Sequence, residues 1–176
     1  MLIIQPSGGL CNRIRVINSA YRLSLKRQEK LLIFWNCNHE LNCPFHFLFQ
    51  PVSEFKITNI HSVADPRKLF YQKTARNYLT NDDILKNRLP DGKLSPSFVE
   101  SLKGNTYIFT WESFYPSQDY HLFLPVAPLK ARIDQMIGTF GSSCIGVHIR
   151  RTDNQPSIGK SSTDAFLAAM QEELLK

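Results

Sequence analysis

The pattern of apolar strand, glycine loop, amphipathic helix and second apolar strand at the start of the chain constrains its fold most. The first strand is the apolar run Leu2–Ile4, which ends at the loop signal Pro6–Gly9. Apolar side chains then recur at helical spacing over residues 12–26, and Leu31–Trp35 is a second buried strand. Two strands joined by a crossover helix form a βαβ unit. The sequence therefore predicts an α/β, Rossmann-like domain with a parallel sheet.

The rest of the chain predicts further elements and a second domain. We expect a strand over 106–111, a strand over 144–149, and helices over 67–79, 82–86, 129–140 and 163–175. Strand 144–149 and helix 163–175 are typical of the first βα unit of another Rossmann-like domain. We therefore predict an N-terminal domain at 1–127 and the start of a second domain at 128–176, its remainder absent. The alternative is that strand 144–149 joins the first sheet.

Charge is concentrated at one end of the chain. The 21 Lys and Arg against 15 Asp and Glu give a net charge of +6. Residues 1–30 hold six of these bases against one acid, Glu29, which is +5: Arg13, Arg15, Arg22, Lys26, Arg27 and Lys30. Such a cluster favours an anionic partner, or it is simply the solvated face of a helix. We expect no nucleic-acid partner, because no motif of that class is present and aromatic residues do not interleave with the basic ones; a nucleic-acid-binding protein is kept only as a distant third alternative.

Composition and hydropathy exclude several other classes. The 43% hydrophobic and 20% charged residues are ordinary for a globular domain and exclude a disordered tail. The longest clearly apolar run is Leu31–Trp35, whereas a membrane helix needs about 20 residues. The first residues also lack the basic and long apolar regions of a signal peptide. We expect a cytoplasmic protein without a membrane span.

Four closely spaced residues raise the question of a metal. Cys37, His39, Cys43 and His46 could close a tetrahedral zinc site. The spacing lacks a tight pair of cysteines two residues apart, and the segment continues into a Phe-rich run. Packed core cysteines with incidental histidines are the preferred interpretation, and we predict no metal.

Two polar loops carry the candidate chemistry. Gly8–Arg13 lies between the first strand and its helix, where free N–H groups favour an anion. His148–Asp153 extends from the predicted strand 144–149. Ligands of open α/β sheets bind beyond the carboxyl ends of the strands, and an arginine fork suits phosphate oxygens. From the loops alone, Asn12 could equally be a helix cap, and Arg151 could form a structural salt bridge with Asp153.

Together the two loops resemble the α1,2/α1,6/protein O-fucosyltransferase superfamily. His148–Asp153 is similar to its H-x-R-R-x-D motif, and Gly8–Arg13 is similar to its N-terminal G-x-x-G-N-[QR] loop, with Cys11 at the second glycine. The order and placement of both motifs match, and a helix with Ser162, Asp164, Phe166 and Met170 follows. Within this superfamily the chain most resembles the bacterial members, which include chitooligosaccharide-type nodulation enzymes.

The resemblance implies a GT-B fold and an inverting, metal-independent transfer of fucose from GDP-fucose to a sugar or protein hydroxyl. It implies that Arg150 is catalytic and stabilises the leaving diphosphate, with Asn12 reaching the donor from the acceptor-side domain 1–127. The remaining residues of the two motifs would bind substrate: His148, Arg151, Asp153, Gly8, Gly9 and Arg13. No cofactor is implied, and the oligomeric state is left open.

Two points stay open in the sequence. Trp111 and Tyr115 could stack on an acceptor sugar, although core packing is the simpler interpretation for each. The chain could also be a nucleotide-sugar-binding remnant without turnover, because the later motifs of the superfamily lie beyond residue 176.

Overall fold

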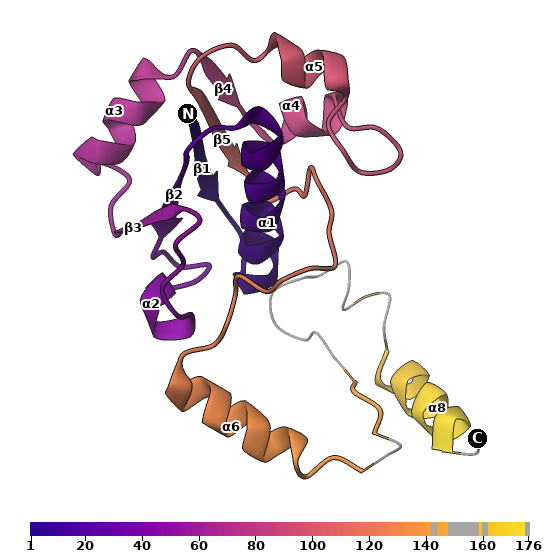
Figure 1. Ribbon diagram of the computed structural model, residues 1–176. Helices are drawn as coiled ribbons and strands as arrows, with labels where there is room; N and C mark the ends of the chain where they lie inside the picture. The colour runs from indigo at the N-terminus through magenta and orange to yellow at the C-terminus, as the bar shows by residue number, and fades with distance from the viewer. Residues whose placement is uncertain (142–143, 148–158, 160–161, 175–176) are drawn as a thin grey trace. The chain divides into compact units, whose positions relative to one another are not determined.

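The computed structural model describes residues 1–141, 144–147, 159 and 162–174. The chain forms two compact units, Met1–Asp134 and Gln135–Lys176. The first unit contains a parallel sheet whose strand order is β3-β2-β1-β5-β4 (Figure 1). Its strands are β1 (Leu2–Pro6), β2 (Leu31–Asn36), β3 (Lys56–Ile60), β4 (Asn77–Leu79) and β5 (Thr106–Thr110). Every pairing in this sheet is parallel, which confirms the predicted α/β class.

The predicted βαβ unit is present with nearly the predicted limits. Helix α1 (Leu10–Arg27) joins β1 to β2, and those two strands pair in parallel with Leu2 opposite Leu31. The helix ends where Gln28 adopts a left-handed φ of 52°, and its backbone N–H donates to the Leu25 carbonyl. The 3-to-4 spacing of apolar residues thus predicted this helix well.

The sheet has a separate apolar cluster on each face. Leu2 and Ile4 of β1 point to one face and Ile3 to the other, as the alternation of a strand requires. Residues of α1 and of three shorter helices cover the first face: α2 (Phe45–Leu48), α4 (Asn81–Lys86) and α5 (Pro96–Ser101). Helix α3 (Pro66–Thr74) packs on the second face through Tyr71. Burial on both faces explains the continuous apolar runs of β1 and β2.

Two predicted elements differ in the structure. The helix predicted over 67–79 ends at Thr74, and residues 77–79 form β4. The backbone N–H groups of Arg76 and Asn77 both donate to the Asn105 carbonyl, and the Tyr78 ring stacks on Tyr107 at 5.5 Å between centroids. Pairing with β5 therefore overrides the local helical pattern.

The strand predicted over 144–149 is wrong for residues 144–147, which have no regular secondary structure. Ile145 and Val147 are 57% and 43% exposed. A strand needs a partner that accepts its backbone hydrogen bonds, and no pairing to residues 144–147 occurs in the described part of the chain. Helices α6 (Ala127–Ile137) and α8 (Thr163–Leu174) lie close to their predicted limits.

None of the helices in the described ranges combines the length and the hydropathy that a membrane span requires.

Candidate functional site

The glycine loop lies at the point of the sheet where the strand order reverses. Strand β1 has β2 on one side and β5 on the other, because the chain proceeds from β1 to β2 and β3 and then returns through β4 to β5 on the opposite side (Figure 1). The backbone N–H of Ser7, just after β1, donates to the Thr110 carbonyl at the end of β5, 3.0 Å away. Open α/β sheets bind ligands beyond the carboxyl ends of their strands. The loop predicted from the sequence therefore occupies the usual ligand-binding position of this architecture.

Gly8 has a backbone conformation that only glycine adopts without strain. Its φ is +79°, and a Cβ atom at this position would lie 2.7 Å from the Asn12 amide nitrogen. Gly9, by contrast, has an ordinary φ of −70° and open space around its Cα. The loop is thus tight at Gly8, where the backbone approaches the Asn12 side chain, and open at Gly9.

Asn12 lies in the first turn of α1 rather than at its cap. The cap residue is Gly9, and no side chain caps the helix. The side-chain Oδ1 of Asn12 accepts a hydrogen bond from the Arg15 guanidinium, and its Nδ2 amide group points back over Gly8. The uncapped N–H groups and an amide donor therefore lie together where the helix dipole favours an anion. Arg15 is exposed beside them and was not among the predicted site residues.

Arg13 is buried beneath the loop, which corrects its predicted contact with substrate. Its side chain has no exposed surface and donates to the Gly8 carbonyl (2.7 Å), the Asn36 carbonyl and Asn38 Oδ1 (2.7 Å). The guanidinium also lies over the Trp35 ring. Burial lowers the pKa of Arg13, and the charge of Glu40 opposes this shift. Because the donors of Arg13 point into the protein, we infer that its side chain holds the glycine loop in place and does not contact substrate.

Members of the N-terminal basic cluster have internal partners. Arg22 pairs with Asp119 at 2.9 Å, and Arg13 lies 3.7 Å from the Glu40 carboxylate; both acids are outside residues 1–30. The charge available to an external anion is therefore smaller than the +5 of residues 1–30 indicates. Of the arginines in this cluster, Arg15 is the exposed one at the glycine loop.

An exposed tryptophan follows β5 on the other side of the strand-order reversal. Trp111 is 47% exposed, and its backbone N–H donates to Asn81 Oδ1 at 3.0 Å. The same Asn81 oxygen accepts from the Thr110 hydroxyl at 2.6 Å. These bonds fix the start of the loop that adjoins Ser7. Exposure argues against core packing as the role of Trp111, whereas Tyr115 is packed against the main apolar cluster.

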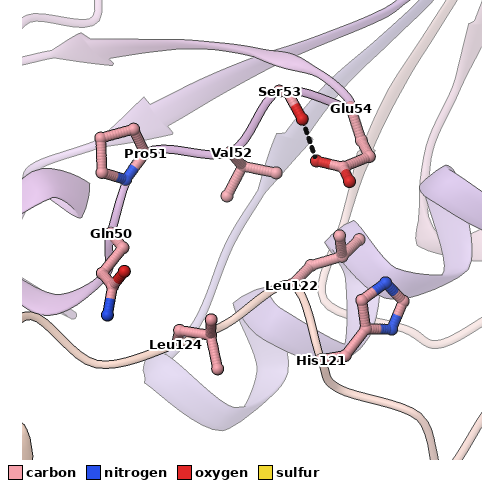
Figure 2. Close-up of a pocket in the computed structure, with 8 residues that line it drawn as sticks. All are labelled: Gln50, Pro51, Val52, Ser53, Glu54, His121, Leu122 and Leu124. Carbon is pink, nitrogen blue, oxygen red and sulfur yellow. Dashed lines mark hydrogen bonds between the residues drawn. The ribbon is translucent and has the colours of Figure 1, made fainter.

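A hollow of about 280 Å³ lies apart from the predicted site residues (Figure 2). Its apolar wall includes Val52, Leu122 and Leu124, with Gln50 at one end and two ionisable residues, Glu54 and His121, at the other. The pKa of Glu54 is lowered, chiefly by a hydrogen bond from its own backbone N–H. None of the residues in the glycine loop lines this hollow.

The second predicted loop lies outside the described residues. This applies to Arg150, His148, Arg151 and Asp153, so their predicted roles stay predictions.

The Cys37–His46 segment forms part of the fold beside β2. Cys37 is buried, which raises its thiol pKa, and the Cys43 carbonyl accepts from the Trp35 indole N–H at 2.7 Å. His46 Nδ1 lies 3.3 Å from the Asn59 amide nitrogen. Among the described positions, no cluster of three or more His, Cys, Asp or Glu side chains could hold a metal ion.

Comparisons with protein-family models, with curated proteins and with solved structures find no match for this chain.

Proposed function

We propose that the chain belongs to a fucosyltransferase-like glycosyltransferase of the GT-B type. Its residues 1–127 would form the acceptor-side domain, and residues 128–176 would begin the domain that binds the donor nucleotide. The proposed reaction is the inverting transfer of fucose from GDP-fucose to a hydroxyl of a glycan or protein. No metal is proposed to take part.

One observation carries this proposal more than any other. Gly8, at a φ of +79°, packs against Asn12 in the first turn of α1, beside the reversal of strand order. A substrate phosphate or sugar can approach the backbone closely there, because Gly9 carries no side chain and has open space around it. The resemblance of residues 8–13 and 148–153 to the two superfamily motifs supports the diphosphate of a nucleotide sugar as the anion bound there.

The proposed mechanism assigns one task to each loop. As the bond between fucose C1 and the phosphate oxygen breaks, negative charge develops on the diphosphate and positive charge on the sugar ring. A guanidinium held beside the diphosphate interacts more strongly with this transition state than with the intact donor, and so accelerates the reaction. Arg150 is proposed to supply that guanidinium. Asn12 is proposed to orient the donor through its amide group.

Transfer of radiolabelled fucose from GDP-fucose to a panel of glycan acceptors tests the proposal. We expect labelled product together with released GDP. Arg150→Ala should reduce transfer below a tenth of the wild-type rate, since loss of one such donor costs about 10²–10³ in rate. Arg150→Lys should fail as well, because an ammonium group cannot replace the planar fork. Arg132→Ala, at an exposed position of α6, is the matched control and should leave transfer unchanged.

Calorimetric titration with GDP-fucose separates the alternative outcomes. Binding without transfer would favour a nucleotide-sugar-binding protein. Neither binding nor transfer would refute the proposal.

A further inference from the structure

The carboxylate of Glu40 binds directly to the glycine loop. Its Oε2 atom accepts a hydrogen bond from the Gly8 backbone N–H at 2.9 Å. The same oxygen accepts from Asn38 Nδ2 at 3.3 Å and lies 3.7 Å from a terminal nitrogen of Arg13. Glu40 follows β2, the neighbour of β1, so the parallel sheet brings both segments to one edge. Three separate groups therefore hold one oxygen of this carboxylate in place.

The second carboxylate oxygen is available. All of the contacts just described use Oε2, and within the described part of the chain no hydrogen bond to Oε1 occurs. The Glu40 side chain is 33% exposed, so a ligand at the glycine loop can reach it. An anchored oxygen fixes the direction of the free one, and an acid or base needs such a fixed direction to exchange a proton efficiently.

Glu40 and Asn12 meet at the same glycine. Glu40 bonds to the Gly8 nitrogen, and the Asn12 amide packs against the neighbouring Gly8 Cα, where a Cβ would lie 2.7 Å from it. An amide donor and a carboxylate therefore flank one backbone position. In the proposed reaction Asn12 orients the donor sugar, which places the carboxylate beside the sugar that an incoming hydroxyl attacks.

We propose that Glu40 is the general base that activates the acceptor hydroxyl, an inference that rests on the proposed function. The acceptor O–H proton passes to the free oxygen of Glu40. The acceptor oxygen then bonds to fucose C1 as the C1–O bond to the diphosphate breaks, and the bonding electron pair leaves with GDP. The proton later passes to solvent, which regenerates the carboxylate. No further reactant is needed.

The decisive variant is Glu40→Gln, tested in the full chain. An amide oxygen can still accept from the Gly8 N–H, so the loop is preserved while the proton acceptor is lost. We expect kcat to fall about 10²–10⁴-fold, with the KM for GDP-fucose unchanged. The dependence of kcat on pH should differ between the wild type and the variant, because only the wild type carries the proton acceptor. In Glu40→Ala, added formate should restore part of the activity.

Glu100→Gln is the matched control. Glu100 is an exposed carboxylate on α5, and it has no contact with the glycine loop in the described structure, so its kcat and pH profile should match those of the wild type. Melting temperatures of all variants show whether the fold is retained.

Two results would overturn the inference in distinguishable ways. If the wild type transfers fucose and Glu40→Gln keeps more than a tenth of its kcat with the same pH profile, Glu40 only holds the loop and is not the base. If the wild type transfers no fucose to any acceptor, the proposed function fails, and the role of Glu40 fails with it.

Discussion

Replacing the buried Arg13 with methionine should strongly destabilise the first unit of the chain. Methionine keeps much of the apolar length of the side chain and removes all of its donors. Three acceptors lose the hydrogen bond from Arg13: the Gly8 carbonyl, the Asn36 carbonyl and Asn38 Oδ1, of which the last keeps a bond from the Leu41 backbone N–H at 3.3 Å. All three lie around a side chain with no exposed surface, so water replaces the lost donors poorly.

The size of the effect follows from these contacts. A hydrogen bond from a charged group contributes about 1.5–3 kcal/mol, and breaking up a buried ionic cluster costs about 3–5 kcal/mol. Retained packing of the methionine offsets part of the loss. We therefore expect the free energy of unfolding to fall by about 3–5 kcal/mol, which lowers the melting temperature by roughly 6–20 °C for a chain of this size.

Urea unfolding followed by tryptophan fluorescence measures this change. The buried Trp35 lies under the Arg13 guanidinium and reports directly on the site. Arg22→Met is the control, because the Arg22–Asp119 pair is 37% and 47% exposed and such pairs contribute about 0–1 kcal/mol. A loss below about 1 kcal/mol for Arg13→Met, or equal losses for both variants, would show that the Arg13 contacts do not hold the loop.

Further predictions concern the glycine loop and an acidic helix cap. Gly8→Ala should cost about 1–3 kcal/mol of stability, because alanine is strained at a φ of +79° and its Cβ meets Asn12, whereas Gly9→Ala should change stability by less than about 1 kcal/mol. Paired chemical-denaturation curves check this, and equal effects would contradict it. Asp65 is the cap residue of α3, and a hydrogen bond from Arg67 is the main cause that lowers its pKa from 3.8 to about 2. The stabilisation by Asp65 is therefore complete above pH 4 and disappears as the pH falls toward 2. Between pH 5 and pH 2, the free energy of unfolding of Asp65→Asn should decline less steeply than that of the wild type. Parallel curves would show that the Asp65 carboxylate is not the cause of the acid destabilisation.

The sequence predicted the parts of the fold in which local pattern and tertiary packing agree. The helix at α1 has a wide apolar stripe and buries it against β1 and β2, so periodicity alone located it. Both of those strands are buried on two faces and are therefore continuous apolar runs. The glycine loop was recognisable because Gly8 needs a positive φ that few other residues adopt.

Edge strands were not predictable in the same way. β3 has the mixed sequence Lys56–Ile60 and is mostly only partly buried at the edge of the sheet. β4 has three residues and depends on its pairing with β5. Neither strand has a strong local pattern of apolar residues. Both are stabilised mainly by hydrogen bonds to a neighbouring strand.

The candidate site was only partly predictable from its residues. Gly8, Gly9 and Asn12 were identified from the loop, but the burial of Arg13 was not, since its acceptors come from segments distant in sequence. Glu40 was missed as well. A rule that examines every polar residue shortly after each central strand would have found it, because β2 ends at Asn36 beside β1.

The place of β1 in the sheet also has a consequence for how the chain folds during synthesis. Leu2 of β1 pairs with Thr106 of β5, so one edge of β1 stays unpaired until the ribosome has added about a hundred further residues. At roughly 5–20 residues per second, that flank stays unpaired for roughly 5–20 seconds in the nascent polypeptide. Because unpaired strand edges favour association with other chains, we expect the nascent polypeptide to be prone to aggregation during this interval.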